Sequence, residues 1–181
     1  MDQLTEMLVE QLRDAFSAEK QAIQGMKRNL RKVTDPKLRE GIEAHVEQSE
    51  TQRERVEQAL SSLDARPGRK VCEAMRGLVE EAQHEQEEHE KGPLLDLVTI
   101  AALQRIEHYE IAAYGTMTEL ARALGKTEVA DLMAQTLEEE KAQDQRLTEV
   151  TRSSVLPAAM QAGEKGAEEG SGRQASPRRS G

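Results

Sequence analysis

Acidic side chains at helical spacing are the residues of this sequence that could do chemistry. In the segment from Gln104 to Gly115, which reads QRIEHYEIAAYG, Glu107 falls on the apolar stripe that a helix forms at about 100° per residue. Burying an ionised carboxylate is costly unless a cation or several hydrogen-bond donors compensate for the lost water. Because its stripe is expected to be buried, Glu107 needs a cation or hydrogen-bond donors as a partner.

Two other segments place carboxylates on an apolar face at a similar depth. Glu19 lies near the centre of the stripe of the first predicted helix. Glu140 and Asp144 are four residues apart, so they lie one turn apart on the apolar face of residues 128–151. We expect these side chains to point into one shared interior.

The second predicted helix, residues 36–63, carries neutral polar groups on its buried side instead. His45 is a potential nitrogen ligand, and Gln52 can hydrogen-bond to a neighbouring ligand. The other polar residues on or beside the Glu107 stripe are Gln104, Glu110 and Tyr114. Each of the four long helices thus brings polar groups inward near its midpoint.

Carboxylates gathered in one interior repel one another strongly unless cations neutralise them. A pair of divalent or trivalent metal ions would hold these groups ionised, and oxygen-rich ligation favours iron or manganese over zinc. The candidate metal ligands are Glu19, His45, Glu107, Glu110, Glu140 and Asp144. The residues expected to hold these ligands by hydrogen bonds are Gln52, Gln104 and Tyr114.

A metal-free interior is the alternative interpretation of the same residues. A single inward Glu is more often an edge residue whose stem packs on apolar surface, and His45 alone is more often a core histidine than a ligand. The coincidence of acidic residues on three helices at matching depth favours the metal site. Without metal, hydrogen bonds and shared protons would have to close the interior.

Apolar periodicity defines the elements that must bring these side chains together. It predicts long helices over residues 3–33, 36–63, 94–124 and 128–151, and a shorter connecting helix over residues 69–89. Asp35 and Pro36 signal a helix start, and Gly125 signals a helix end. Up-and-down connection places the midpoints of four similar helices at one level. The predicted fold is all-α, an up-down four-helix bundle with a short connecting helix between the second and third long helices.

The C-terminal segment differs in composition from the rest of the chain. Residues 1–155 are predicted to form the bundle as one domain, and residues 156–181 are predicted to be a disordered tail. The tail contains the run GEKGAEEGSGRQASPRRSG, which is rich in Gly, Ser and charge. Such a segment cannot offset its ordering entropy by burying apolar surface.

Composition excludes several classes of protein. The net charge of -9 and pI near 5.1 argue against nucleic-acid binding, because phosphates would be repelled. The single cysteine, Cys72, excludes an intramolecular disulfide and a cysteine-based metal cluster, and it fits a reducing compartment. The N-terminal segment has neither the basic start of a secretory signal nor a membrane-spanning apolar run. We therefore expect a cytoplasmic protein without membrane partners.

Four segments together resemble the YciE/YciF family of ferritin-like bacterial proteins, also known as DUF892. They are EKQAI around Glu19, CEAMRGLVEEA around Cys72, IAALQRIEHYEIAAYGTMTELARALG and TLEEEKAQDQRLTEV. The resemblance covers about residues 3–152, and EHYEIAAYG and LEEEKxxD are quite specific. It implies a ferritin-like four-helix bundle that is usually dimeric, is associated with bacterial stress responses and is often labelled a candidate ferroxidase.

The resemblance also implies which acidic residues form the metal site. They are Glu19 on the first helix, Glu107 or Glu110 on the third long helix, and Glu140 and Asp144 on the last helix. The wider ferritin-like pattern has Glu-x-x-His on the second and fourth helices. This sequence has no such motif at mid-depth on either helix, so one ion, or none, is the alternative to a metal pair.

The sequence thus leads to two expectations from different classes of protein. The first is a homodimeric, ferritin-like stress-response protein that binds two iron ions, or manganese, between its helices and acts as a ferroxidase or removes oxidants. The second is a metal-free, dimeric structural or interaction protein of the stress response. The two differ in whether the interior requires cations.

Overall fold

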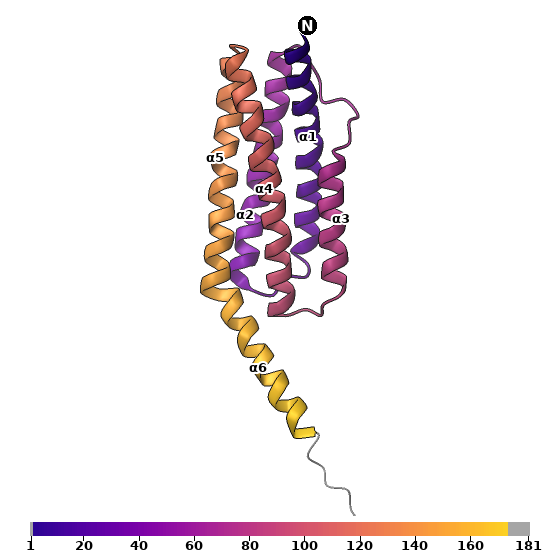
Figure 1. The fold of residues 1–181 in the computed structure, drawn as a ribbon, viewed down its shortest axis with the longest axis vertical. Helices are drawn as coiled ribbons and strands as arrows, with labels where there is room; N and C mark the ends of the chain where they lie inside the picture. Colours follow the sequence, from indigo (N-terminus) through magenta and orange to yellow (C-terminus); the bar gives the residue numbers. More distant parts are fainter. Residues whose placement is uncertain (1, 174–181) are drawn as a thin grey trace, which may run out of the picture.

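Four long helices run side by side with alternating direction in the computed structural model, which describes residues 2–173 and their side chains as far as residue 164 (Figure 1). The long helices are α1 (Gln3–Asn29), α2 (Pro36–Ser62), α4 (Pro93–Ala123) and α5 (Thr127–Val150). The shorter α3 (Glu73–Glu87) packs on the outside, against α1 and α4. The predicted all-α, up-down four-helix bundle with a short connecting helix is confirmed.

Local sequence signals set the ends of the helices. The side chain of Asp35 caps α2 by accepting a hydrogen bond from the Leu38 amide at 2.9 Å, and Pro36 occupies the first turn. Gly125 follows the end of α4 with φ of 68°, a left-handed conformation that glycine adopts without strain. Both helix ends lie where the sequence predicts them.

A buried aspartate anchors the connection between α1 and α2. Asp96 of α4 accepts hydrogen bonds from the Thr34 amide at 2.8 Å, the Thr34 hydroxyl at 2.6 Å and the Asp35 amide at 2.8 Å. Its own side chain is only 1% exposed. The first helix ends at Asn29 rather than at the predicted Val33, and the chain then turns to reach Asp96.

The interior consists of two apolar clusters separated along the bundle by a polar layer. The cluster nearer the α4–α5 turn includes Leu8, Leu12, Val56, Met117 and Met133. The cluster nearer the α1–α2 turn includes Ile23, Met26, Ile42, Leu103 and Leu147. Each long helix contributes to both clusters and carries buried polar residues between its two contributions. The polar layer is therefore held between two water-excluding regions.

The chain continues as helix beyond the bundle. A π-helical turn, Thr151–Val155, joins α5 to α6 (Leu156–Arg173), which projects from one end of the bundle (Figure 1). The predicted disordered tail, residues 156–181, is therefore helical as far as Arg173, and its remaining residues lie outside the described part. Pro157 cannot donate a backbone hydrogen bond, and the wide π turn lies directly before it. The residues that follow Pro157 include alanines, which are strong helix formers.

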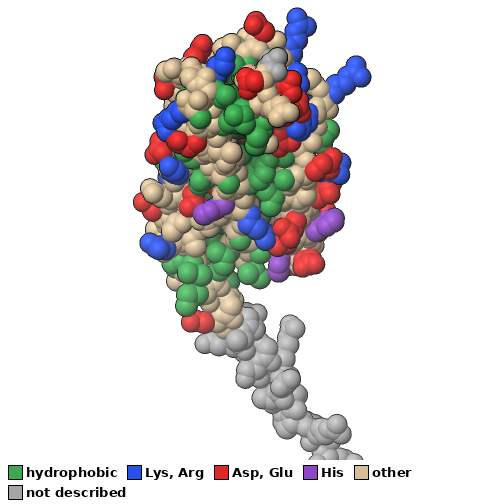
Figure 2. All heavy atoms as spheres, turned by 45° about the horizontal axis from the view of Figure 1, so that its top comes forward, with side chains coloured by type: hydrophobic (Ala, Val, Ile, Leu, Met, Phe, Trp, Pro, Cys, Tyr) green, Lys and Arg blue, Asp and Glu red, His purple; other side chains and the backbone are tan. Residues whose placement is uncertain are grey.

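The surface of the bundle is strongly charged. On the face that Figure 2 presents, acidic and basic side chains are interspersed around patches of exposed apolar atoms. Within residues 2–173, no helix is both long enough and apolar enough to cross a membrane.

Replacing Asp96 with alanine should lower the free energy of unfolding by about 2 to 4 kcal/mol, because three donors of the α1–α2 connection lose their acceptor. Urea unfolding followed by circular dichroism measures this change. The control is Asp131→Ala, an exposed position on α5, which should change stability by less than about 0.5 kcal/mol. Equal effects of the two substitutions would show that Asp96 is not an anchor.

Candidate metal centre

The polar layer brings together acidic side chains from three helices and a histidine from the fourth. Glu19 comes from α1, Glu107 and Glu110 from α4, Glu140 from α5 and His45 from α2. All five are at most 2% exposed. On each helix, apolar residues before and after the polar layer pack in the two clusters. The face that carries them, and with it each of these polar residues, therefore points into the bundle.

Four of these residues lie close enough to share an ion. His45, Glu107, Glu110 and Glu140 each offer a ligand atom within 4.8 Å of the others. The Nε2 atom of His45 lies 3.2 Å from a Glu107 oxygen and 4.0 Å from a Glu140 oxygen. Carboxylate oxygens with one imidazole nitrogen form a donor set that suits iron or manganese.

Buried polar atoms of this layer make no well-directed hydrogen bond to another protein atom, although His45 Nε2 lies 3.2 Å from Glu107 Oε1. In the described part of the chain they are Glu19 Oε2, His45 Nδ1, Gln52 Oε1, both oxygens of Glu107, Glu110 Oε1 and both oxygens of Glu140. Buried polar atoms in folded proteins nearly always have a partner, and each unpaired one costs about 1 to 3 kcal/mol. Eight such atoms in one layer therefore fit a site whose partner is not a protein atom.

Burial shifts the pKa of every titratable group in this layer. Burial, reinforced by the negative charge of Glu140, raises the pKa of Glu19 to about 8. Burial also raises the pKa of Glu107 to about 8. Burial and the neighbouring carboxyls raise the pKa of Glu110 and Glu140 well above the usual range, and burial lowers the pKa of His45. Without a cation, the layer would therefore stay protonated and neutral near pH 7.

Tyr114 orients Glu19 at the edge of the four-residue cluster. Its hydroxyl, buried in α4, donates a hydrogen bond to Glu19 Oε1 at 2.5 Å. The other oxygen of Glu19, Oε2, has no partner. Tyr114 therefore fixes one oxygen of Glu19 and leaves the other without a protein partner.

Gln52 is held in place by an ion pair that sequence reasoning missed. Glu139 accepts a hydrogen bond from the Gln52 amide nitrogen at 3.1 Å. Arg55 in turn binds both oxygens of Glu139, at 2.5 and 2.8 Å. This bidentate contact fixes the amide of Gln52, whose oxygen is buried and unpaired. The sequence could have predicted this contact, because an arginine and a glutamate lie at the same depth as Gln52 on two neighbouring helices.

Asp144 does not reach the cluster, although it was a predicted ligand. Its carboxylate accepts a hydrogen bond from Gln104 at 3.0 Å and lies 3.5 Å from His108 Nε2, and its side chain is 22% exposed. Gln104 therefore contacts Asp144 and not a member of the cluster. On α5 the residue beside Glu140 that faces inward is Gln143, which is 2% exposed.

The comparisons with known proteins agree with this architecture. The family model described as a domain of unknown function (DUF892) matches residues 3–160. Protein YciF of Escherichia coli (strain K12) is 40% identical over 156 residues, which are 86% of this chain and 94% of that protein. The crystal structure of the E. coli stress protein YciF superimposes with a TM-score of 0.81 over 86% of this chain and 98% of that chain.

More distant structures share the same fold. YcfI from Rhodopseudomonas palustris is 32% identical, with a TM-score of 0.78 over 82% of this chain and 94% of that chain. Ferritin-like, diiron-carboxylate proteins from Bacillus anthracis str. Ames are 16% identical, with a TM-score of 0.66 over 83% of this chain and 99% of that chain. At that identity the likeness shows that the bundle has the ferritin-like fold.

The metal-free protein should become less stable as the pH rises from about 5 to about 8, measured by urea unfolding in the presence of a chelator. The carboxyls of Glu19 and Glu107 keep their protons to about pH 8 in the folded chain and lose them near the usual value of 4.5 in the unfolded chain. The folded state therefore binds more protons across this window, and each group lowers the free energy of unfolding by up to about 1.4 kcal/mol per pH unit.

The Glu19→Gln/Glu107→Gln double variant provides the comparison for this pH series. It removes two of the four buried carboxyls whose pKa is raised, so its stability should depend less on pH than that of the wild type. The lowered pKa of His45 acts in the opposite direction and is present in both proteins. Identical pH profiles of the wild type and the double variant would contradict the assignment.

Proposed function

Because this chain belongs to the DUF892 family and shares its bundle with ferritin-like diiron-carboxylate proteins, we propose that it binds one or two iron or manganese ions between α1, α2, α4 and α5. The observation that carries the proposal is the set of buried, unpaired ligand atoms in the polar layer. These atoms belong to residues of all four long helices. A cation would give each of them a partner.

The ligands proposed for the ion are the cluster residues His45, Glu107, Glu110 and Glu140. Glu19 would add its unpaired Oε2 atom and extend the donor set towards a second ion. When bound, iron would supply one-electron chemistry towards dioxygen or a peroxide. The proposed set has five ligands and leaves out Asp144, because its carboxylate accepts a hydrogen bond from Gln104.

The other residues of the layer orient the ligands and exclude water. Tyr114 holds Glu19 by one oxygen and leaves the other for an ion. Gln52, fixed by Glu139, has a buried amide oxygen that can accept a hydrogen bond within the layer. The apolar clusters on both sides keep bulk water away, which strengthens every electrostatic interaction within the site.

The proposed role is a response to oxidants or to excess Fe(II) under stress. The E. coli relative is described as a stress protein. A carboxylate-rich interior stabilises Fe(III) more than Fe(II), which favours ferroxidase-type oxidation or removal of peroxide. We also propose that the chain acts as a homodimer in the cytoplasm, as the family resemblance implies.

A metal-free structural or interaction protein is the second candidate. It is favoured by the raised pKa of Glu19 and its glutamate neighbours, because protonated carboxyls can close the interior without a cation. In that case the layer would act as a neutral hydrogen-bonding network. Metal analysis separates the two candidates.

Protein purified without a chelator should contain about one to two iron or manganese ions per chain by elemental analysis. Adding Fe(II) or Mn(II) to chelator-treated protein at about a hundredfold its Kd should raise the Tm by about 5 to 10 °C, because a ligand that binds only the folded state stabilises it. The Glu107→Gln/Glu140→Gln variant should lose both the bound metal and the shift in Tm.

The control for this experiment is Glu138→Gln. Glu138 is on the same helix as Glu140 but is 71% exposed and pairs with Lys141, so its loss should leave metal content unchanged. Absence of metal from the wild type, together with an unchanged Tm after Fe(II) addition, would favour the metal-free candidate.

The proposed activity is tested with Fe(II) as the substrate and hydrogen peroxide as the oxidant. One peroxide accepts two electrons from two Fe(II) ions and yields two hydroxide ions. Stopped-flow absorbance should show Fe(II) oxidation at least about tenfold faster with the wild type than with Glu107→Gln/Glu140→Gln. Equal rates would contradict a ferroxidase-type activity while leaving metal binding intact.

A further inference from the structure

A groove runs along the seam between α1 and α3, which lie side by side in Figure 1. It consists of three hollows of about 420, 290 and 290 Å³. Gln21 and Gln24 line both the first and the second hollow, and Arg28 and Val79 line both the second and the third. The three hollows are therefore one continuous feature, which we name the α1–α3 groove.

The α1–α3 groove is basic although the chain as a whole carries a net charge of -9. Two of its cations are neutralised, since Lys70 pairs with Glu10 at 3.2 Å and Arg76 pairs with Glu73. The cations that make no ion pair within the described residues are Lys20, Arg28, Arg31, Lys32 and Arg69. The only acidic residues among those that line the three hollows are Glu80 and Glu87.

The floor of the groove is apolar. It is formed by Phe16, Val71, Val79, Ala82 and Ile106. Val71 is 50% exposed, so its side chain is accessible to a partner. α1 lines the groove from Phe16 to Asn29, which is about 20 Å of helix at 1.5 Å per residue, and Arg31 and Lys32 continue the lining in the turn that follows.

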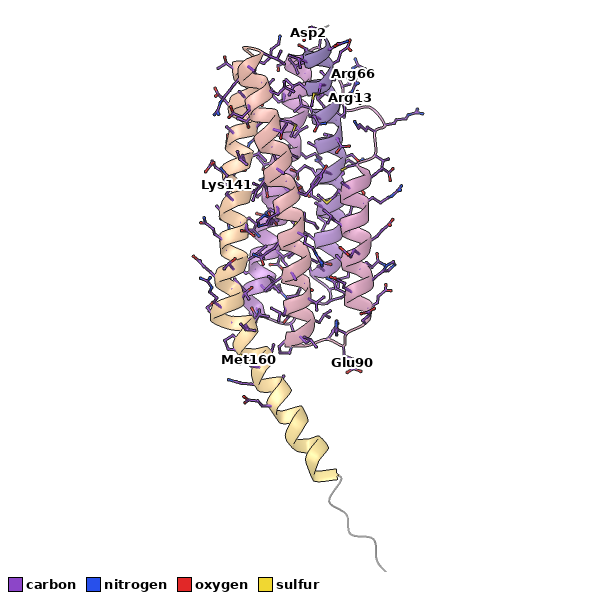
Figure 3. All side chains as sticks on the ribbon, viewed as in Figure 1. Asp2, Arg13, Arg66, Glu90, Lys141 and Met160 are labelled. Carbon is purple, nitrogen blue, oxygen red and sulfur yellow. The ribbon has the colours of Figure 1, made fainter. Side chains whose placement is uncertain are left out.

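One wall of the groove is held in position by a contact to α1. Arg69 and Lys70 belong to the connection between α2 and α3. The side chain of Arg13 donates a hydrogen bond to the Arg66 carbonyl at 3.0 Å, and the two residues lie together at one end of the bundle in Figure 3. The basic residues of the connection are thus presented from a fixed segment.

We propose that the α1–α3 groove binds an acidic, amphipathic helix of a partner protein. A helix of about 16 residues spans its length, an apolar stripe would cover the floor, and carboxylates at the edges would meet the unpaired cations. Nucleic acid fits less well, because Phe16 is the only aromatic side chain among the lining residues and offers a single stacking position for bases. A small anion would contact only some of the five cations that make no ion pair.

The test uses a fluorescein-labelled synthetic peptide of about 18 residues, with Leu on one helical face and Glu on the other, and measures its binding to the full chain by fluorescence anisotropy. Two further probes are a scrambled peptide of the same composition and an oligo(dT) of the same charge. The groove variant is Arg28→Glu/Arg31→Glu/Lys32→Glu. The matched control reverses three exposed cations outside the groove, Arg122→Glu/Lys126→Glu/Lys141→Glu.

We expect the wild type and the control variant to bind the amphipathic peptide at least about tenfold more tightly than the groove variant does. Binding should weaken as salt is raised from about 50 to 300 mM, because exposed charges are screened. Circular dichroism verifies that both variants are folded.

Three results would overturn the proposal. They are no measurable binding of the amphipathic peptide, equal binding of the scrambled peptide, and an equal loss of binding in the control variant. Tighter binding of the oligo(dT) than of the peptide would identify the groove as a nucleic-acid site instead. None of these outcomes depends on metal, so the proposal can fail while the proposed function stands.

Discussion

The structure depends on one constraint, which is that several carboxyl groups lie in the dry interior of a helical bundle. Glu19, Glu107, Glu110 and Glu140 have almost no contact with water and few hydrogen-bond partners. Such groups must either hold protons or share a cation, because ionised carboxylates in this position repel one another and lack solvation. The choice between protons and a cation is the choice between the two candidate functions.

The rest of the fold keeps this layer closed and in register. The apolar clusters above and below it supply the burial that stabilises the bundle, and they offset the cost of the polar layer. Asp35, Asp96 and Gly125 fix the turns, so the midpoints of the helices meet at one level.

Periodicity predicted the four long helices and the inward direction of Glu19, His45, Glu107 and Glu140, because a stripe at helical spacing must face the core. The buried face that it predicted for α5 is rotated slightly from the face that the structure buries. Thr136 and Gln143 are buried, whereas Asp144 is partly exposed. The apolar pattern of one helix gives the direction of its buried face, but it does not give the positions of the neighbouring helices. Those positions decide which residues at the edge of the face are covered.

The same limit explains the other differences. Glu110 was predicted to lie at the edge of its stripe but is fully enclosed, because α4 packs against α1, α3 and α5 and so buries a wide arc. The proposed metal site is tested most directly by anomalous diffraction at the iron and manganese absorption edges from crystals of the metal-loaded protein. One or two anomalous peaks are expected within bonding distance of carboxylate oxygens of Glu107 and Glu140. Peaks confined to the surface, or an interior without any peak, would contradict a metal site in the polar layer.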